Sequence, residues 1–271
     1  MRRFLRNIAL VLVFGASGLG GAATAYAELS IIPTRVLFEG RERFEEVILL
    51  NTGKETRTYD MSWEFFKMIE GSSKSMQERV DQSITDFDLS EHVVFTPRRV
   101  TLPPRGRQKI RLALRRPAEV PVGDYRAYLR FSPTFDDEAG EADPIQGQSA
   151  AVSFRYRFAI PIIFQSGDLD VAAKIESMNF ERNEKNGKLI AKINISRSGI
   201  HSALGHLFIY DNKGEVIGEI SNAHVYSEVG SREMKVLLST DNLSGQTITV
   251  EYRHYDKDKN IVFDRREFPI Q

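Results

Sequence analysis

Residues that could act in catalysis or bind a metal are dispersed along this chain of 271 residues. From residue 28 onward there is no G-x-S-x-G motif, no phosphate-binding loop and no cysteine, so the usual hydrolytic nucleophiles are missing. No H-x-H or H-E-x-x-H spacing occurs among the histidines, which are His92, His201, His206, His224 and His254. The acidic runs at 136–138 and 256–258 lack an EF-hand loop and indicate solvated loops. The sequence therefore predicts a protein that is not an enzyme and holds no metal or cofactor.

The pattern that favours a binding function runs from Ala150 to Phe164, AAVSFRYRFAIPIIF. In an extended chain, alternate residues share a face. One face is then strongly apolar and carries Val152, Phe154, Tyr156, Phe158, Ile160 and Ile162. This surplus of apolar side chains suggests that another chain packs on the strand. The alternative is that these side chains fill the core of their own sheet.

The first 27 residues predict an export signal. Three arginines lie within the first six residues, an apolar run covers 8–14, and a small-x-small cleavage site covers 25–27. The remainder has 34 basic against 37 acidic side chains, which gives no bias towards nucleic acid. No later run is long enough to span a bilayer. We expect a periplasmic location, although a signal of this kind also fits full secretion.

Beyond the signal, short β-rich runs separated by turn residues predict an all-β protein. The expected architecture is two immunoglobulin-like β-sandwich domains, 28–165 and 166–271, joined by a short hinge at 165–168. Without cysteine, the stability of both sandwiches must come from burial.

The sequence predicts four local features. One strand is expected over 31–38, and the strand 125–131 is expected to place Tyr125, Ala127, Leu129 and Phe131 on one face. The polar segment 70–88 predicts a loop or a short helix. The acidic segment 132–149 predicts a long mobile loop.

Four motifs in the first domain resemble the periplasmic chaperones of the chaperone–usher pathway, which assemble pili and related surface fibres. They are TRVLFEG at 34–40, LPPRGRQKIRL at 102–112, GDYRAYLRF at 123–131 and the closing strand at 154–164. The resemblance covers residues 29 to about 165, and the second domain matches only in size and β character.

The resemblance implies a mechanism. Pilus subunits are sandwiches that lack a strand, and the chaperone caps each subunit with its own closing strand before delivery to an outer-membrane usher. By position the donated residues are Val152, Phe154 and Tyr156, with Phe158 as a further candidate. The family arginine at Arg35 clamps the C-terminal carboxylate of the subunit, a task that suits a guanidinium. The alternative for Arg35 is a surface ion pair with Glu39 or another acid.

One position departs from the family pattern. The family has a second carboxylate anchor, a lysine, where this chain has Pro161, which offers neither charge nor N–H. Arg157 lies on the same strand face and is a candidate substitute. This departure keeps open a stand-alone structural or adhesion-type sandwich protein. An apolar edge of this kind also favours self-association.

Overall fold

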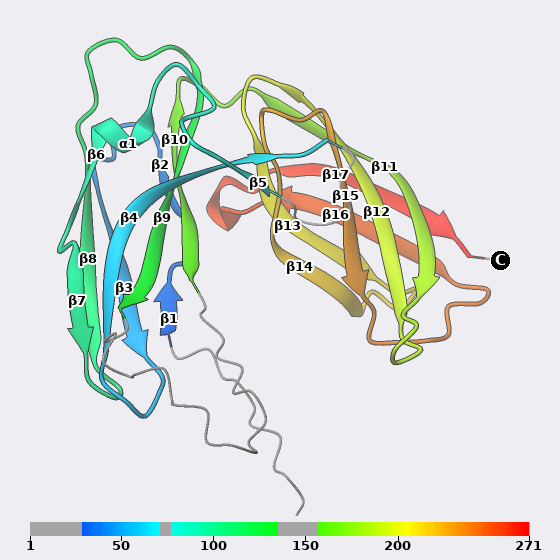
Figure 1. Ribbon diagram of the computed structural model, residues 1–271. Coiled ribbons are helices and arrows are strands. Elements are labelled where there is room, and N and C mark those ends of the chain that lie inside the picture. The colour runs from blue at the N-terminus through cyan, green and yellow to red at the C-terminus, as the bar shows by residue number, and fades with distance from the viewer. Residues whose placement is uncertain (1–28, 71–76, 135–156, 271) are drawn as a thin grey trace, which may run out of the picture.

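The structure is a computed structural model and describes residues 29–70, 77–134 and 157–270 (Figure 1). It is all-β with two sandwiches, as the sequence predicts. The first sandwich contains β1 (Leu29–Ile32), β2 (Val36–Phe38), β3 (Phe44–Asn51), β4 (Arg57–Met68), β5 (Gln77–Val80), α1 (Leu89–His92), β6 (Val93–Thr96), β7 (Arg99–Leu102), β8 (Arg107–Leu114), β9 (Gly123–Thr134) and β10 (Phe158–Ser166). The second contains β11 (Val171–Arg182), β12 (Leu189–Gly199), β13 (Ala203–Tyr210), β14 (Val216–Val225), β15 (Ser231–Leu237), β16 (Thr247–His254), the 3₁₀ helix η1 (Lys257–Lys259) and β17 (Val262–Pro269).

Two sheets face each other in the first sandwich. Their strand orders are β1-β3-β8-β6 and β2-β10-β9-β4-β5, with β7 also paired to β4. The predicted face of β9, which carries Tyr125, Ala127, Leu129 and Phe131, is buried in the core between them. This alternation confirms the expected register, because a slip by one residue would turn all four side chains outward.

The expected single strand over 31–38 is wrong. The chain forms β1 in one sheet and β2 in the other, and Pro33 lies in the crossing between them. A proline has no N–H to donate to a strand ladder, so it favours such an interruption. The polar segment 70–88 contains the short strand β5, which the sequence reading missed, and the four-residue helix α1 follows it.

Strand β10 connects the two halves of the molecule. It pairs with β9 along its whole length, but with β2 only at Ile162–Phe164. On one face Ile160, Ile162 and Phe164 enter the core of the first sandwich. On the other face Ile163 is buried in the hydrophobic cluster of the second sandwich. β10 is therefore buried on both faces at its C-terminal end.

The second sandwich packs the sheet β11-β12-β15 against the sheet β14-β13-β16-β17. Its core continues into the first sandwich, because Met68, Ile163 and the partly buried Leu37 belong to the same cluster. Residues 167–170 connect β10 to β11 (Figure 1). The fully buried His201 binds both ends of this connection, since its Nε2 donates to the carbonyl of Ser166 (3.1 Å) and its Nδ1 accepts from the amide of Asp170 (3.0 Å).

Within the described ranges, no helix is long and apolar enough to cross a membrane.

Candidate functional site

Arg35 directly precedes β2, and Pro161 directly precedes the three residues of β10 that pair with β2. Val36 pairs with Ile162 in the parallel ladder of β2 and β10, and continuing that register by one residue places Arg35 beside Pro161. Pro161 in turn pairs with Tyr128 on β9. Because alternate residues share a strand face, Arg35 faces the same way as Leu37, which packs on the second sandwich. The departure at Pro161 thus falls directly next to the predicted anchor.

The Arg35 guanidinium rests on an aromatic ring of the other sandwich. Its central carbon lies 4.9 Å from the centroid of the Tyr255 ring. Its Nη1 is buried and has no hydrogen-bond partner in the structure. Burial lowers the pKa of Arg35, and the nearby tyrosines oppose that shift. Among the described residues, the structure gives Arg35 no carboxylate partner.

The alternative pairing of Arg35 with Glu39 is not what the structure has. Glu39 instead accepts hydrogen bonds from the Tyr255 hydroxyl (3.0 Å) and from Lys259 Nζ (2.6 Å). Glu39 therefore stabilises the ring on which Arg35 rests and η1, which carries Lys259. Within the described residues, Glu39 is therefore not the partner of Arg35.

A pocket of about 380 Å³ opens beside Arg35, between the two sandwiches. Segment 33–37 forms one wall, and Asn222, Tyr255 and Asp256 of the second sandwich form another. Asn222 has a left-handed backbone (φ 61°) and its Nδ2 donates to the Thr34 hydroxyl (3.2 Å), which links the two walls. The carboxylates that line the pocket are Glu39, Glu42, Glu45 and Asp256.

Arg126 links β9 to the second sandwich. It is 7% exposed, forms an ion pair with Glu228 (2.5 Å) and donates to the carbonyl of Phe66 (3.2 Å). Its guanidinium lies 3.5 Å from the centroid of the Tyr226 ring. This arginine is neutralised, so it holds the sandwiches together and is not a free anchor.

The sequence did not predict a role for His224 or Arg232. The pKa of His224 is lowered to about 3, by burial first and then by Arg232 and other arginines. The neutral ring binds the Asn222 carbonyl through Nδ1 (2.7 Å), so Nδ1 carries the proton, and Nε2 is a buried acceptor without a partner. Arg232 Nη1 donates to the His224 carbonyl (2.6 Å). In the sequence, His224 was one of several dispersed histidines without the spacing of a metal site, and nothing distinguished Arg232 from other arginines.

Of the predicted donor residues, Val152, Phe154 and Tyr156 lie outside the described residues. Phe158 is described, and it packs partly buried against the core of its own sandwich. The edge of β10 beside it is open, because β2 pairs only with Ile162–Phe164 and no other described strand pairs on that side of 158–161.

Arg157, the predicted substitute for the missing lysine, is exposed. It precedes Pro161 by four residues, which corresponds to about 13 Å along an extended strand. The structure therefore does not bring Arg157 and Arg35 together.

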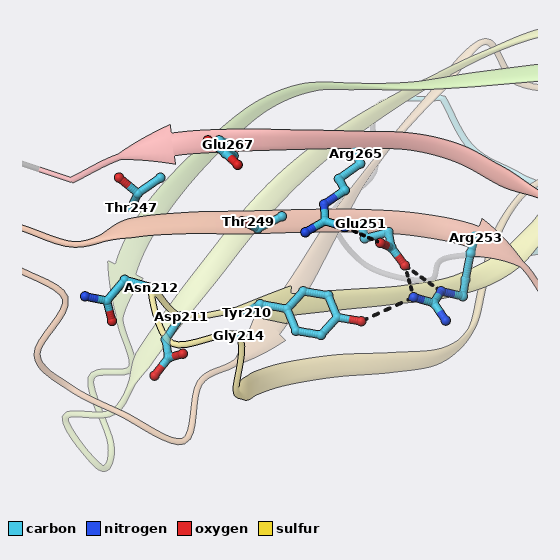
Figure 2. A pocket seen from close by; sticks show the side chains of 10 residues that line it. All are labelled: Tyr210, Asp211, Asn212, Gly214, Thr247, Thr249, Glu251, Arg253, Arg265 and Glu267. Atoms are coloured by element: carbon cyan, nitrogen blue, oxygen red, sulfur yellow. Dashed lines mark hydrogen bonds and ion pairs between the residues drawn. The ribbon is translucent and has the colours of Figure 1, made fainter.

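A second hollow, of about 560 Å³, lies on the outer face of β13, β16 and β17 (Figure 2). At its centre the buried Glu251 binds Arg253 and lies 3.6 Å from Arg265, while Arg253 also donates to the Tyr210 hydroxyl (3.4 Å). Arg253 and Arg265 thus share the single carboxylate of Glu251. Nowhere in the described part of the chain do three or more acidic or histidine side chains gather as metal ligands would.

No family model matches the chain, and no curated protein matches it. Solved structures do match, among them the class 5 fimbriae chaperone CfaA, with 17% identity over 90% of this chain and 99% of that one and a TM-score of 0.44. The CupB2 chaperone of Pseudomonas aeruginosa matches with 11% identity over 89% and 100% of the two chains and a TM-score of 0.43. A Salmonella enterica structure of the SafA pilin with the SafB chaperone matches with 9% identity over 92% and 99% and a TM-score of 0.44.

Proposed function

We propose that this protein is a periplasmic chaperone that binds and caps pilus-type or fimbrial subunits and delivers them to an outer-membrane usher. It caps a subunit by donating the strand at about 150–164 and by anchoring the subunit's C-terminal carboxylate on Arg35. No catalytic step is involved, and no cofactor is needed.

The observation that carries the proposal is the state of Arg35. An arginine that is partly buried, as Arg35 is, is normally paired with an acid, because an uncompensated charge in a poorly solvated place is costly. Arg35 instead rests on Tyr255 and has a buried Nη1 without a partner. A carboxylate that enters the neighbouring pocket would supply the missing acceptor through charge-assisted hydrogen bonds.

The donated strand is supported by the open edge of β10. An edge strand with unpaired N–H and C=O groups is a template for another chain. Period-two alternation carries Val152, Phe154 and Tyr156 onto the apolar face that continues at Phe158. Burying each of these side chains in a partner is worth about 1.5 to 3 kcal/mol relative to exposure. Phe158, which contacts its own core, is the least suited of the four.

That contact of Phe158 also favours a second candidate function, a stand-alone sandwich protein that binds a surface partner through its loops. In that case the whole apolar face, including the segment before Phe158, would fill the first sandwich. Pro161 also favours a stand-alone sandwich protein, because it replaces the lysine that is the family's second carboxylate anchor.

A charge-substitution experiment separates the two functions. The double variant Phe154→Asp and Tyr156→Asp is expected to lose capture of an exported β-rich subunit from the periplasm while its melting temperature stays near that of the wild type. The matched control is Leu237→Asp with Val262→Asp, which places two acids at exposed apolar strand positions (51% and 49% exposed) in the second sandwich. Unfolding of the Phe154 and Tyr156 variant, with the control folded, would support core packing and contradict the proposal.

A further inference from the structure

The pocket beside Arg35 carries more negative than positive charge. Arg35 is the cation of its lining, while Glu39, Glu42, Glu45 and Asp256 are acids. A site that only had to bind a carboxylate would be expected to exclude such acids, because like charges repel the incoming group.

Only one of the four acids in the pocket lining, Glu39, is neutralised by an ion pair among the described residues. Glu39 is paired with Lys259 and with the Tyr255 hydroxyl. Glu42 accepts a hydrogen bond from the amide of Glu39 (3.2 Å), and Asp256 accepts one from the amide of Asp258 (3.0 Å). Among the described residues, no ion pair is formed by Glu42, Glu45 or Asp256. Three acids without an ion-pair partner thus line the pocket.

Glu42 and Glu45 also act on each other. The pKa of Glu45 is raised, by burial first and then by the charge of Glu42. A cation placed between them would relieve this repulsion. Arg41 and Arg43, in the segment just before β3, are exposed and do not line the pocket, so they do not supply that cation to its interior.

We propose that the pocket selects a polypeptide C-terminus that carries a lysine or arginine within the few residues before its terminal carboxylate. The carboxylate binds Arg35, and the basic side chain lies against Glu42, Glu45 and Asp256. The inference rests on the proposed anchoring by Arg35 and adds the chemistry of the partner to it. A subunit whose C-terminal segment is acidic is then a poor client.

Short peptides test this preference on the whole mature protein. The probes are three acetylated hexapeptides that end in Lys-Lys-Phe, Gln-Gln-Phe or Glu-Glu-Phe with a free carboxylate, and the same three as C-terminal amides. Binding is followed by NMR titration of the protein at low salt, because surface charge effects are screened as salt rises. The lysine peptide is expected to bind about fivefold more tightly than the glutamine peptide, the factor for one charge pair at a solvated surface. The glutamate peptide is expected to bind most weakly.

Protein variants test whether the preference for lysine depends on the acidic residues that line the pocket. The double variant Glu42→Gln and Glu45→Gln is expected to bring the affinity of the lysine peptide close to that of the glutamine peptide. The control Glu119→Gln, at an exposed position outside the pocket, is expected to leave the ratio of the two affinities unchanged. Equal binding of the three free-acid peptides, with loss on amidation, would overturn the inference and leave the anchor intact. A lysine preference that persists on amidation would contradict the anchor while supporting the acidic wall. Binding by none of the peptides would contradict both.

Discussion

Arg35 and Tyr255 belong to different sandwiches, yet the guanidinium carbon of Arg35 lies 4.9 Å from the centroid of the Tyr255 ring. Tyr255 is itself held by its hydrogen bond to Glu39 of the first sandwich. Two cross-domain contacts therefore meet at this point, and both depend on how the sandwiches are oriented. The proposed anchor is a property of the domain junction and not of β2 alone.

Replacing the ring should misplace the anchor. Tyr255→Leu removes the cation–π contact, which is worth about 0.5 to 2 kcal/mol, so subunit capture is expected to weaken by a few-fold or more. Tyr255→Phe keeps the ring and removes only the hydroxyl, and it is expected to retain most of the capture. Quantitative pull-down of the subunit measures both variants. Equal loss in both would show that the Glu39 hydrogen bond matters and the ring does not.

A lysine at the family position should strengthen the site. Pro161→Lys would place an ammonium beside Arg35, on a neighbouring strand about 4.8 Å away. In the free protein the two cations repel, so its melting temperature is expected to fall slightly. With a carboxylate bound, a second charge-assisted hydrogen bond is expected to raise affinity about tenfold. Titration with a C-terminal peptide checks this, and unchanged affinity in a folded variant would place the carboxylate elsewhere.

The stability of the junction between the sandwiches should depend strongly on Arg126. Arg126→Met leaves Glu228 without its ion-pair partner, and breaking a buried pair in this way costs about 3 kcal/mol or more. Thermal unfolding is expected to show a melting temperature lower by roughly 6 to 12 °C. The control is Arg99→Met, which breaks the exposed pair with Asp60 and is expected to leave the melting temperature unchanged. A similar small effect for both variants would mean that the Arg126 pair does not stabilise the junction.

His224 should make stability depend on pH. Its pKa is about 3 in the folded protein against an ordinary value of 6.5. Between those two values the unfolded chain binds a proton that the folded chain does not, so stability falls as the pH drops below 6.5. The slope from this group reaches about 1.4 kcal/mol per pH unit.

Denaturant unfolding between pH 7 and pH 4 measures that slope. His224→Gln, which does not titrate, is expected to lose this part of the pH dependence while the part from carboxylates remains. An identical slope in wild type and variant would show that His224 is solvated or already charged in the folded protein.

The sequence predicted the elements whose periodicity is local. The alternation in 125–131 gave the buried face of β9, because one face of that strand fills a single core. The two-sandwich architecture followed from the spacing of turns and strands.

What the sequence did not predict depends on tertiary docking. The other face of β9 carries Arg126 and Tyr128, polar types that alternation assigns to solvent, yet both are buried at the junction. Likewise, Glu39 stands close to Arg35 in sequence, but the partners of its carboxylate are more than 200 positions away. Such pairings become visible only once the second sandwich is placed against the first.

The central claim is that Arg35 anchors an exported subunit. The most direct measurement is a pull-down of the tagged protein from its native periplasm, with mass spectrometry of the bound chains, for the wild type, Arg35→Ala and the exposed control Arg41→Ala. We expect the wild type and Arg41→Ala to recover a small β-rich exported protein and Arg35→Ala to recover none. Recovery of the same subunit by a folded Arg35→Ala, at the level of the wild type, would contradict anchoring by Arg35.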